Sequence, residues 1–545
     1  MISFAVLPPF VIFVPLNKKH SSINHDIPMS GFFGVVSHKD CANEVFYGTD
    51  YHSHLGTKRG GLAIYNHEKN TYHRDIHNLE NSYFRTKFGE EVTGYHGNSG
   101  IGCISDTDAQ PILRRNSIGT YAVATVAKIN NIDALADELM KKRGLSFAEQ
   151  SDGGYNPTEL IALMIHEGKD FVEGIRYVQN KVLGSCSMLV LYNEQIIAGR
   201  DKLGRTPIVI GAKTYEDGTT AYSVASESTS FLNLGYKLVH ILGPGEIVSV
   251  TKDGFKTLGE PLPQSQVCSF LWVYYGYPPS VYDDNINVDT VRYRCGEMLA
   301  KSDMLDAEQH KPDAPQHEEI DFVAGIPDSG VGHALGYSNT RHRPYMRPYV
   351  KYTPTWPRSF MPQDQAQRRL VAKMKLIPNK DIINGKTGVF LDDSIVRGTQ
   401  LRDNVKDLVD CGIKDVHMRI ACPPLVFPCE FLNFSRSRSS SELATLRAIM
   451  RLIAPKVRER EGIEETDINN EPLKSACIKE LEAMDLTPYS NPDSNEYKMM
   501  VEEMRKELGL STLKFQKLDD LVAAIGLPKS RLCTHCFDGS SWGYK

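Results

Sequence analysis

The chain has 545 residues, of which 41% are hydrophobic and 24% charged, and its formal net charge is −5. This composition is typical of a globular protein, and the length predicts two domains rather than one. The sequence contains no concentrated basic run, which argues against a nucleic-acid partner. The apolar run near the N-terminus is shorter than the roughly 18 residues of a membrane span, so we expect no membrane association and a cytoplasmic location.

Residues 1–28 are expected to form an N-terminal extension. Their apolar run is interrupted by Pro8, Pro9 and Pro15 and has no basic region before it, so it is weak as a signal peptide. Two interpretations stay open: a targeting segment, or a true start at Met29.

The pattern of apolar residues changes near residue 262. From Met29 onward, apolar strands alternate with glycine-rich turns around one helical segment at residues 157–182, which predicts an α+β domain of layered sheets over residues 29–262. Residues 263–545 form the second expected domain, an α/β domain that contains the most informative motif of the chain.

That motif is VFLDDSIVRGTQ, from Val389 to Gln400. An apolar strand precedes it, and an amphipathic helix that ends near Gly412 follows it. A loop between strand and helix directs backbone N–H groups, and the positive end of the helix dipole, toward an anion. We therefore expect a phosphate-binding site.

The side chains of this loop extend the prediction. Asp392 and Asp393 are adjacent carboxylates, expected at the exposed end of the strand, that can hold sugar hydroxyls or the water shell of Mg²⁺. An acidic N-cap on an ordinary turn is the simpler alternative. Four further residues of the loop can wrap and neutralise a phosphate: Ser394, Arg397, Gly398 and Thr399.

The complete run resembles the signature of type I phosphoribosyltransferases, which bind 5-phosphoribosyl 1-pyrophosphate (PRPP). The resemblance implies that Asp392 and Asp393 serve the ribose and Mg²⁺. It implies that the 5′-phosphate is cradled by the following residues: Ser394, Ile395, Val396, Arg397, Gly398, Thr399 and Gln400.

Nearly the whole chain resembles the glutamine phosphoribosylpyrophosphate amidotransferase family, through AGRDKLGRTP, ASES and GPGEIV in the first domain and GIPDSGVGHALGYS in the second. The resemblance implies an N-terminal-nucleophile, class II glutamine amidotransferase domain followed by a type I phosphoribosyltransferase domain. It implies conversion of PRPP and an amine to 5-phosphoribosylamine and pyrophosphate, the first step of purine biosynthesis. Homo-oligomers and regulation by purine nucleotides are further implications.

The first domain departs from the family at its catalytic positions. Ser30 stands where the family has the cysteine nucleophile, Lys128–Asn131 where it has His-Asn-Gly-Asn, Ile104–Thr107 where it has Arg-Tyr-x-Thr, and Pro157 where it has Asp; Arg59 is retained. A hydroxyl is a weaker nucleophile than a thiol, and losing one oxyanion donor costs about 10²–10³ in rate. We expect an inactive glutaminase, and a serine-dependent enzyme stays open.

The second domain keeps the transferase parts. GIPDSG resembles the pyrophosphate loop, which would place Asp328 on the substrate and Ser329 at the metal. Lys351 and Arg358 resemble the cationic lid over the leaving group, although the lid departs from the family at Tyr352–Pro354. A solvated surface lysine is the alternative for Lys351.

Four of the 11 cysteines match the ligands of the iron–sulfur branch of the family: Cys268, Cys429, Cys533 and Cys536. The resemblance implies a 4Fe-4S cluster, and a Cys₄ zinc site is the chemical alternative. Residues 451–495 have no family counterpart, and we expect a helical surface insertion.

Two functional alternatives remain beside the glutamine-dependent enzyme. A paralogue without glutaminase activity would use free ammonia, or it would be a non-catalytic regulator that binds PRPP or nucleotides.

Overall fold

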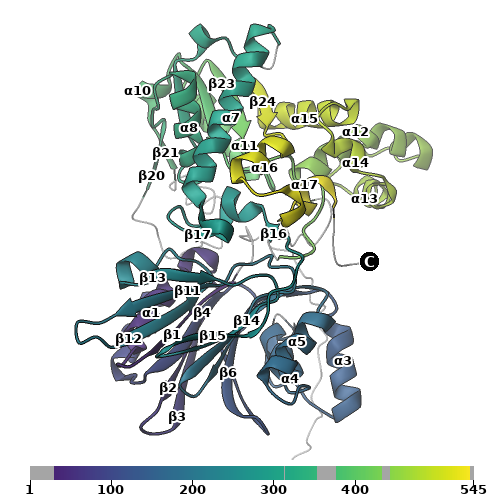
Figure 1. The fold of residues 1–545 in the computed structure, drawn as a ribbon. Coiled ribbons are helices and arrows are strands. Elements are labelled where there is room, and N and C mark those ends of the chain that lie inside the picture. The colour runs from purple at the N-terminus through teal and green to yellow at the C-terminus, as the bar shows by residue number, and fades with distance from the viewer. Residues whose placement is uncertain are drawn as a thin grey trace, which may run out of the picture.

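The computed structural model describes residues 30–80, 82–151, 153–311, 314–352, 376–432 and 442–540. The extension of residues 1–28 and Met29 lie outside these ranges. The chain forms an N-terminal half, from strand β1 to strand β15, and a C-terminal half, from strand β16 to helix α17 (Figure 1). No helix in the described part of the chain is long and apolar enough to cross a membrane.

Two antiparallel sheets make up the N-terminal half. The first has the order β13-β11-β12-β1-β4-β2-β3 and the second the order β15-β14-β10-β9-β6-β5. The strands of the first sheet are β1 (Ser30–Ser37), β2 (Arg59–Asn66), β3 (Thr71–Asn78), β4 (Ser99–Ser105), β11 (Val209–Thr214), β12 (Thr220–Ala225) and β13 (Lys237–Ile241). Those of the second are β5 (Ile112–Asn116), β6 (Gly119–Ile129), β9 (Gly184–Tyr192), β10 (Gln195–Gly199), β14 (Ile247–Thr251) and β15 (Gly254–Gly259). A small hairpin joins β7 (Gln150–Ser151) to β8 (Gly154–Tyr155).

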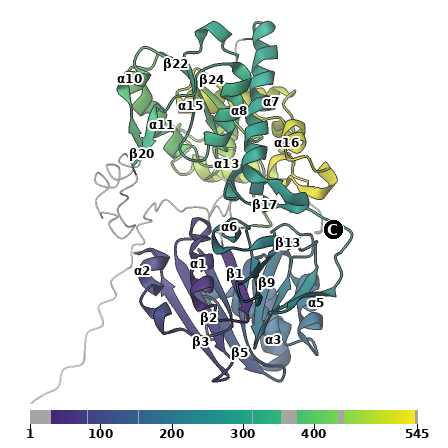
Figure 2. The same ribbon diagram turned by 60° about the vertical axis from the view of Figure 1, so that its left-hand side comes forward.

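Helices cover the outer faces of the two stacked sheets, with α1 and α2 on one side and α3 and α5 on the other (Figure 2). Strand β1 is buried on both faces because Phe32 points between the sheets and Phe33 points toward the helices. This four-layer arrangement confirms the predicted α+β fold. The helices are α1 (Ala42–Asp50), α2 (Phe84–Phe88), α3 (Ile132–Arg143), α4 (Pro157–Ile165), α5 (Phe171–Lys181) and α6 (Phe231–Leu234).

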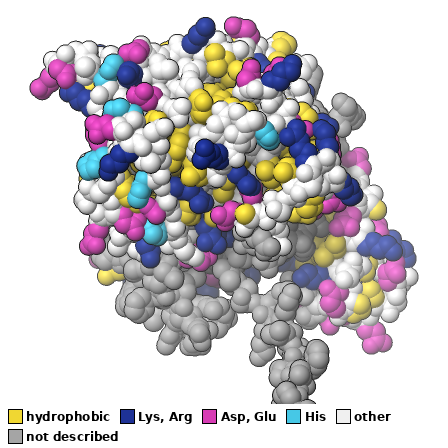
Figure 3. All heavy atoms as spheres, turned by 90° about the horizontal axis from the view of Figure 1, so that it is seen from below, with side chains coloured by type: hydrophobic (Ala, Val, Ile, Leu, Met, Phe, Trp, Pro, Cys, Tyr) yellow, Lys and Arg dark blue, Asp and Glu magenta, His cyan; other side chains and the backbone are white. Residues whose placement is uncertain are grey.

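The single helical segment predicted near residues 157–182 is two helices. Asp170 accepts a hydrogen bond from the backbone N–H of Glu173 and so begins α5 as its N-cap. Seen from below, the N-terminal half shows acidic and basic side chains intermixed (Figure 3).

The C-terminal half contains a parallel sheet in the order β19-β22-β23-β24, which confirms the predicted α/β fold. Helices α7 and α8 pack so closely that a Cβ on Gly296 would lie 1.9 Å from the carbonyl oxygen of His333. The strands of this half are β16 (Val267–Cys268), β17 (Val281–Tyr282), β18 (Ile286–Asn287), β19 (Phe322–Gly325), β20 (Tyr349–Lys351), β21 (Leu376–Pro378), β22 (Thr387–Asp392), β23 (Asp415–Ile420), β24 (Thr512–Phe515) and β25 (Leu532–Cys533). Its helices are α7 (Val288–Glu308), α8 (Val331–Arg341), α10 (Lys380–Ile383), α11 (Thr399–Asp410), α12 (Ala444–Glu461), α13 (Leu473–Ala483), α14 (Thr487–Ser490), α15 (Asn495–Leu508), α16 (Leu518–Ile525) and α17 (His535–Asp538).

Residues 451–495 are helical, as predicted. They cover the second part of α12 and all of α13 and α14. However, Leu473 and Cys477 are fully buried and belong to the same hydrophobic core as the parallel sheet. The segment is therefore part of the packed C-terminal half and not only an addition to its surface.

Candidate active site

The predicted phosphate loop lies at the carboxyl edge of the parallel sheet. Strand β22 ends at Asp392, helix α11 begins at Thr399, and β22 pairs with β19 on one side and β23 on the other. Ligands of open α/β sheets bind outside the carboxyl ends of such strands. The first turn of α11 carries no acidic residue, so the positive end of the helix is suited to an anion.

The acidic pair at the end of β22 is more enclosed than expected. Asp393 is only 3% exposed, so the prediction that both carboxylates lie at an exposed strand end is wrong for this residue. Burial raises the pKa of both acids, and the charge of Asp393 raises that of Asp392 further. The pKa of Asp393 rises to about 6. Two adjacent acids in this state favour a ligand that offsets negative charge, such as Mg²⁺, or one that donates hydrogen bonds, such as a sugar.

The GIPDSG loop, between β19 and α8, meets the acidic pair directly. The Ser329 hydroxyl donates to a carboxylate oxygen of Asp392 at 2.7 Å, and the N–H of Ile326 donates to the carbonyl of Leu391 at 2.9 Å. Gly330 makes this approach possible, because a Cβ there would lie 2.0 Å from the Leu391 carbonyl oxygen. The structure thus places the two predicted loops side by side.

The middle of the phosphate loop contributes backbone rather than side chains. Ile395 is buried in the core of the C-terminal half. The carbonyl of Val396 accepts a hydrogen bond from the N–H of Ala444 at 2.8 Å. Both residues were expected at the 5′-phosphate, and this geometry leaves Ile395 only its backbone for that role.

The end of the loop has the shape that an anion site needs. Gly398 has a φ of 69° and is the N-cap of α11, a left-handed conformation that favours glycine. Thr399 and Gln400 are the first two residues of the helix. Arg397 forms an ion pair with Glu442 at 3.1 Å, and the Ser394 hydroxyl donates to Asp393 at 2.6 Å.

Lys351, at the end of β20, lies beside the GIPDSG loop. Its ammonium forms a 2.7 Å ion pair with Asp328, and both side chains are more than half exposed. Exposed pairs of this kind contribute little stability, so the pair can open at little cost. Arg358, the second predicted cation of the lid, lies outside the described residues.

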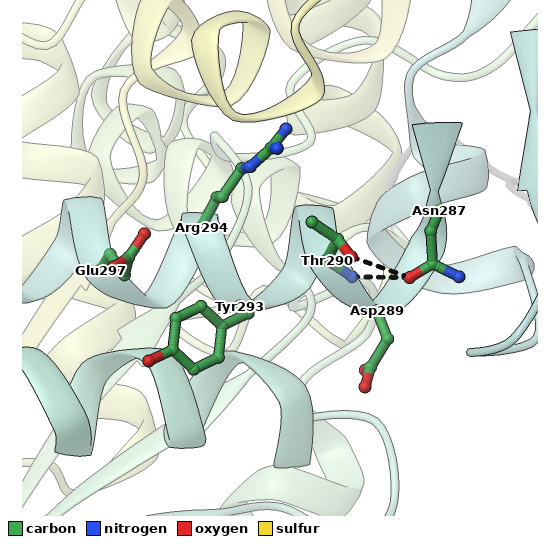
Figure 4. A pocket seen from close by; sticks show the side chains of 6 residues that line it. All are labelled: Asn287, Asp289, Thr290, Tyr293, Arg294 and Glu297. Carbon is green, nitrogen blue, oxygen red and sulfur yellow. Dashed lines mark hydrogen bonds between the residues drawn. The ribbon is translucent and has the colours of Figure 1, made fainter. Parts of the chain in front are cut away.

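A separate hollow of about 390 Å³ lies along helix α7, and it contains none of the predicted site residues (Figure 4). Its lining residues are Asn287, Asp289, Thr290, Tyr293, Arg294 and Glu297.

In the N-terminal half, Ser30 begins the central strand β1 and Arg59 begins β2. Both are register partners of Ser105 on the intervening strand β4, so the three residues form one row across the ends of these inner strands. The Ser30 hydroxyl donates to the Ser105 hydroxyl at 2.9 Å. Arg59 is exposed at the end of this row.

Behind Ser30, hydrogen bonds lead to Asp108. This buried carboxylate accepts bonds from the hydroxyls of Ser105 at 3.0 Å and Thr158 at 2.5 Å, and the Thr158 hydroxyl also bonds to that of Thr125 at 2.6 Å. The polar groups linked to Ser30 therefore pair with one another inside the protein. Asp108 and Thr125 were not predicted as site residues, because a buried acid and a strand threonine carry no distinctive sequence pattern.

The segment Lys128–Asn131 is not part of this network. Ile129 is buried in the core beneath helices α3 to α5, and Asn130 donates to the carbonyl of Glu430 in the other half of the molecule at 2.7 Å. The expectation that this segment replaces the oxyanion residues beside Ser30 does not fit the geometry. Thr125, three residues earlier, is the position that connects to Ser30.

Pro157 has a structural role. It is the first residue of α4, directly after the N-cap Asn156, a position that favours proline because no N–H is needed there. The next acid, Glu159, is fully buried and pairs with Arg114.

The four predicted cluster cysteines come together at the junction of the two halves. Cys268 on β16 and Cys533 on β25 are register partners in a short parallel ladder. The N–H groups of Val426 and Phe427, just before Cys429, both donate to the carbonyl of Cys536 at 3.1 Å. All four thiols are buried. Burial raises the pKa of each thiol, and the pKa of Cys536 is raised further by the charges of the other three.

Among the described residues, no three side chains of His, Cys, Asp or Glu converge closely enough to hold a single metal ion. A four-iron cluster binds one thiolate at each iron, so its ligands surround a larger volume than those of one zinc ion. The donor set, four buried thiols around one junction, fits such a cluster chemically.

Comparisons with known proteins find relatives over most of the chain. The family model described as glutamine amidotransferase domain matches residues 99–233. The chain is similar to the amidophosphoribosyltransferase of Methanocaldococcus jannaschii, with 32% identity over 431 residues that cover 74% of this chain and 86% of the relative. The enzyme of the same name from Methanothermobacter thermautotrophicus is 28% identical over 528 residues, 95% of each chain.

Solved structures give the same result. Glutamine PRPP amidotransferase from B. subtilis, complexed with ADP and GMP, superposes with a TM-score of 0.69 at 26% identity, over 94% of this chain and 96% of the other. A structure described as the allosteric regulatory enzyme of purine biosynthesis superposes with a TM-score of 0.71 at 25% identity, over 94% and 95%.

Proposed function

Because the chain belongs to the amidophosphoribosyltransferase family, we propose that it transfers the phosphoribosyl group of PRPP to ammonia, giving 5-phosphoribosylamine and pyrophosphate. This is the first step of purine biosynthesis. One observation carries the proposal: the Asp392–Asp393 pair and the GIPDSG loop meet at one sheet edge, joined by the 2.7 Å bond from Ser329 to Asp392. A substrate with phosphate groups at both ends of a ribose needs this pairing of loops.

Each part of the site has a role in this reaction. Asp392 and Asp393 would hold the ribose hydroxyls and, with Ser329, Mg²⁺, which supplies positive charge for the pyrophosphate oxygens. The backbone of Ser394–Gln400 and the N-terminus of α11 would bind the 5′-phosphate. The nitrogen of ammonia bonds to C1 as the C1–O bond to pyrophosphate breaks, and the ammonium nitrogen then loses a proton. Lys351 would offset the charge that develops on the leaving oxygens.

We propose further that the N-terminal half hydrolyses glutamine poorly or not at all. Ser30 replaces the thiol nucleophile, and its hydroxyl is bonded to Ser105 within a network that ends at Asp108. Free ammonia, or ammonia from a partner, would then be the amine donor. We place the boundary between the glutaminase-like domain and the phosphoribosyltransferase domain between residues 262 and 263.

The cofactors, assembly and location follow the family by proposal. Cys268, Cys429, Cys533 and Cys536 would hold a 4Fe-4S cluster that ties the C-terminal tail to the transferase sheet. A homo-oligomer, a cytoplasmic location and regulation by purine nucleotides are also proposed. The ADP and GMP bound to the B. subtilis relative motivate the regulatory part.

The test is pyrophosphate release from PRPP and Mg²⁺ in the presence of ammonium, with a matched sample that lacks ammonium. We expect release only with ammonium and only with Mg²⁺. PRPP binding without release under either condition would instead favour a non-catalytic PRPP-binding regulator, and absence of binding would overturn the proposal.

A further inference from the structure

Two cations of the N-terminal half reach the cysteine site of the C-terminal half. The first is Lys128, near the end of strand β6. Its ammonium donates to the backbone carbonyl of Cys429 at 2.5 Å, while Asn130, two residues later, donates to the next carbonyl, that of Glu430, at 2.7 Å. The segment that the sequence assigns to glutamine chemistry therefore binds the backbone of a predicted cluster ligand.

The second cation is Arg205, which lies between strands β10 and β11 and is 3% exposed. Its guanidinium lies over the ring of Phe431, 3.6 Å from the ring centre, and its own carbonyl accepts a hydrogen bond from the N–H of Cys268 at 3.2 Å. It also lies close enough to Cys533 to act on that thiol by charge and by a hydrogen bond. Arg205 thus contacts the surroundings of three of the four cysteines.

Both cations are held in place by other bonds. Arg205 donates to the carbonyl of Gly184 at 3.3 Å and to the side chain of Gln266 at 3.4 Å. Lys128 belongs to the register of β6 with β9, where its partner is Ser185. Positive charge is therefore held at the rim of the four thiols by strand β6 and by the segment between β10 and β11.

An iron–sulfur cluster with four thiolate ligands carries net negative charge, and its stability and reduction potential depend on nearby charge and hydrogen bonds. On the basis of the proposed cluster, we infer that Lys128 and Arg205 are positioning residues through which the N-terminal half stabilises the cluster. The half that has lost its glutaminase residues would thereby keep a role in the same protein.

The experiment uses the full chain, purified without oxygen, as wild type, Lys128→Met and Arg205→Met. Asn130→Ala is the matched control, because it removes the neighbouring bond to the Glu430 carbonyl without removing charge. Iron content, the rate of bleaching in air and the midpoint potential are measured, and circular dichroism checks the fold. Lys128→Arg, which keeps the charge, tests for rescue.

We expect each methionine variant to lose iron roughly 10- to 100-fold faster than wild type, the usual cost of changing an outer-shell partner. The midpoint potential should become more negative. Each variant removes a positive charge, and this destabilises the reduced cluster more than the oxidised one because the reduced cluster carries one more negative charge. Asn130→Ala should leave the potential unchanged, and Lys128→Arg should restore it.

Three outcomes would overturn the inference. If both methionine variants keep the iron, bleaching rate and potential of wild type, the cations have no such role and the cluster proposal stands. If Asn130→Ala matches Lys128→Met in all three readouts, Lys128 contributes only a contact between the two halves, and its charge has no effect on the cluster. If wild type contains no iron, the inference and the cluster proposal both fail, while ammonium-dependent pyrophosphate release from the same preparation still decides the transferase proposal.

Discussion

The two halves of this protein differ in whether their buried polar groups are satisfied by internal hydrogen bonds. At the transferase edge, two adjacent carboxylates are enclosed with raised pKa values and face a loop suited to a charged ligand. At the row of Ser30, Ser105 and Arg59, the polar groups behind Ser30 are paired by internal hydrogen bonds. Buried groups that stay costly indicate a site that awaits a ligand, whereas polar groups that satisfy one another need no ligand.

The largest effect is expected from the acidic pair. The double change Asp392→Asn and Asp393→Asn should abolish Mg²⁺-dependent PRPP binding, because it removes both charges that would hold the metal and the ribose. Isothermal titration with PRPP measures it, and thermal unfolding checks that the fold is retained. Unchanged PRPP affinity would show that the site lies elsewhere.

The next effect concerns the junction of the halves. Wild type purified without oxygen should contain about four irons per chain, the stoichiometry of a 4Fe-4S cluster, and Cys533→Ser or Cys536→Ser should reduce this to near zero and lower the Tm. Cys411→Ser, a cysteine outside the junction, is the control. A colourless protein with one zinc would replace the cluster by a Cys₄ zinc site.

A smaller effect is expected on stability. Without ligands, burial holds the pKa of Asp393 at about 6, above its unfolded value. Between these values the folded state binds more protons than the unfolded state, so this carboxyl costs stability as the pH rises through about 6. Asp393→Asn should therefore unfold with a free energy on the order of 2 kcal/mol higher than wild type at pH 7, and the difference should vanish near pH 4.

Urea unfolding of both proteins at the two pH values measures this difference. Comparing the variant with wild type cancels the opposite contribution of the buried histidines His52, His333 and His417, whose pKa values are lowered by burial. A variant that is less stable than wild type at pH 7 would contradict the account.

The smallest effect is expected where the glutaminase residues are altered. Ser30→Cys, in protein that begins at residue 30, should leave glutamate release from glutamine within about tenfold of wild type. A thiol restores only the nucleophile, and the hydrogen-bond network behind it would still be closed on Asp108. A gain of several orders of magnitude would show that the remaining machinery is intact.

Much of the C-terminal half could be predicted from sequence because its candidate site is built from contiguous loops. The run from Asp392 to Gln400 lies on one strand–loop–helix unit, so its order in the chain is its order in space. Two features could not be read this way. The burial of Asp393 depends on packing from distant segments, and the nearness of Ser329 to Asp392 depends on the pairing of β19 with β22.

The N-terminal half was harder to predict for the same reason. Asp108 and Thr125 join Ser30 only through strand register and the position of helix α4. The contacts of Lys128 and Arg205 with the cysteine site cross between the halves, and no local pattern of the sequence encodes such a contact. The departure of Lys128–Asn131 from the family could be recognised from sequence, but the contacts of this segment with the C-terminal half could not.

We propose that the C-terminal half transfers the phosphoribosyl group without glutamine chemistry in the N-terminal half. Pyrophosphate release from PRPP should be measured with glutamine and with ammonium, on the full chain, on protein that begins at Ser30, and on its Ser30→Ala variant. We predict that ammonium supports release in all three and that glutamine supports at least about 10²-fold less in each. Equal rates with glutamine and ammonium in the protein that begins at Ser30, lost with glutamine alone in Ser30→Ala, would contradict the account and establish a serine-dependent glutaminase.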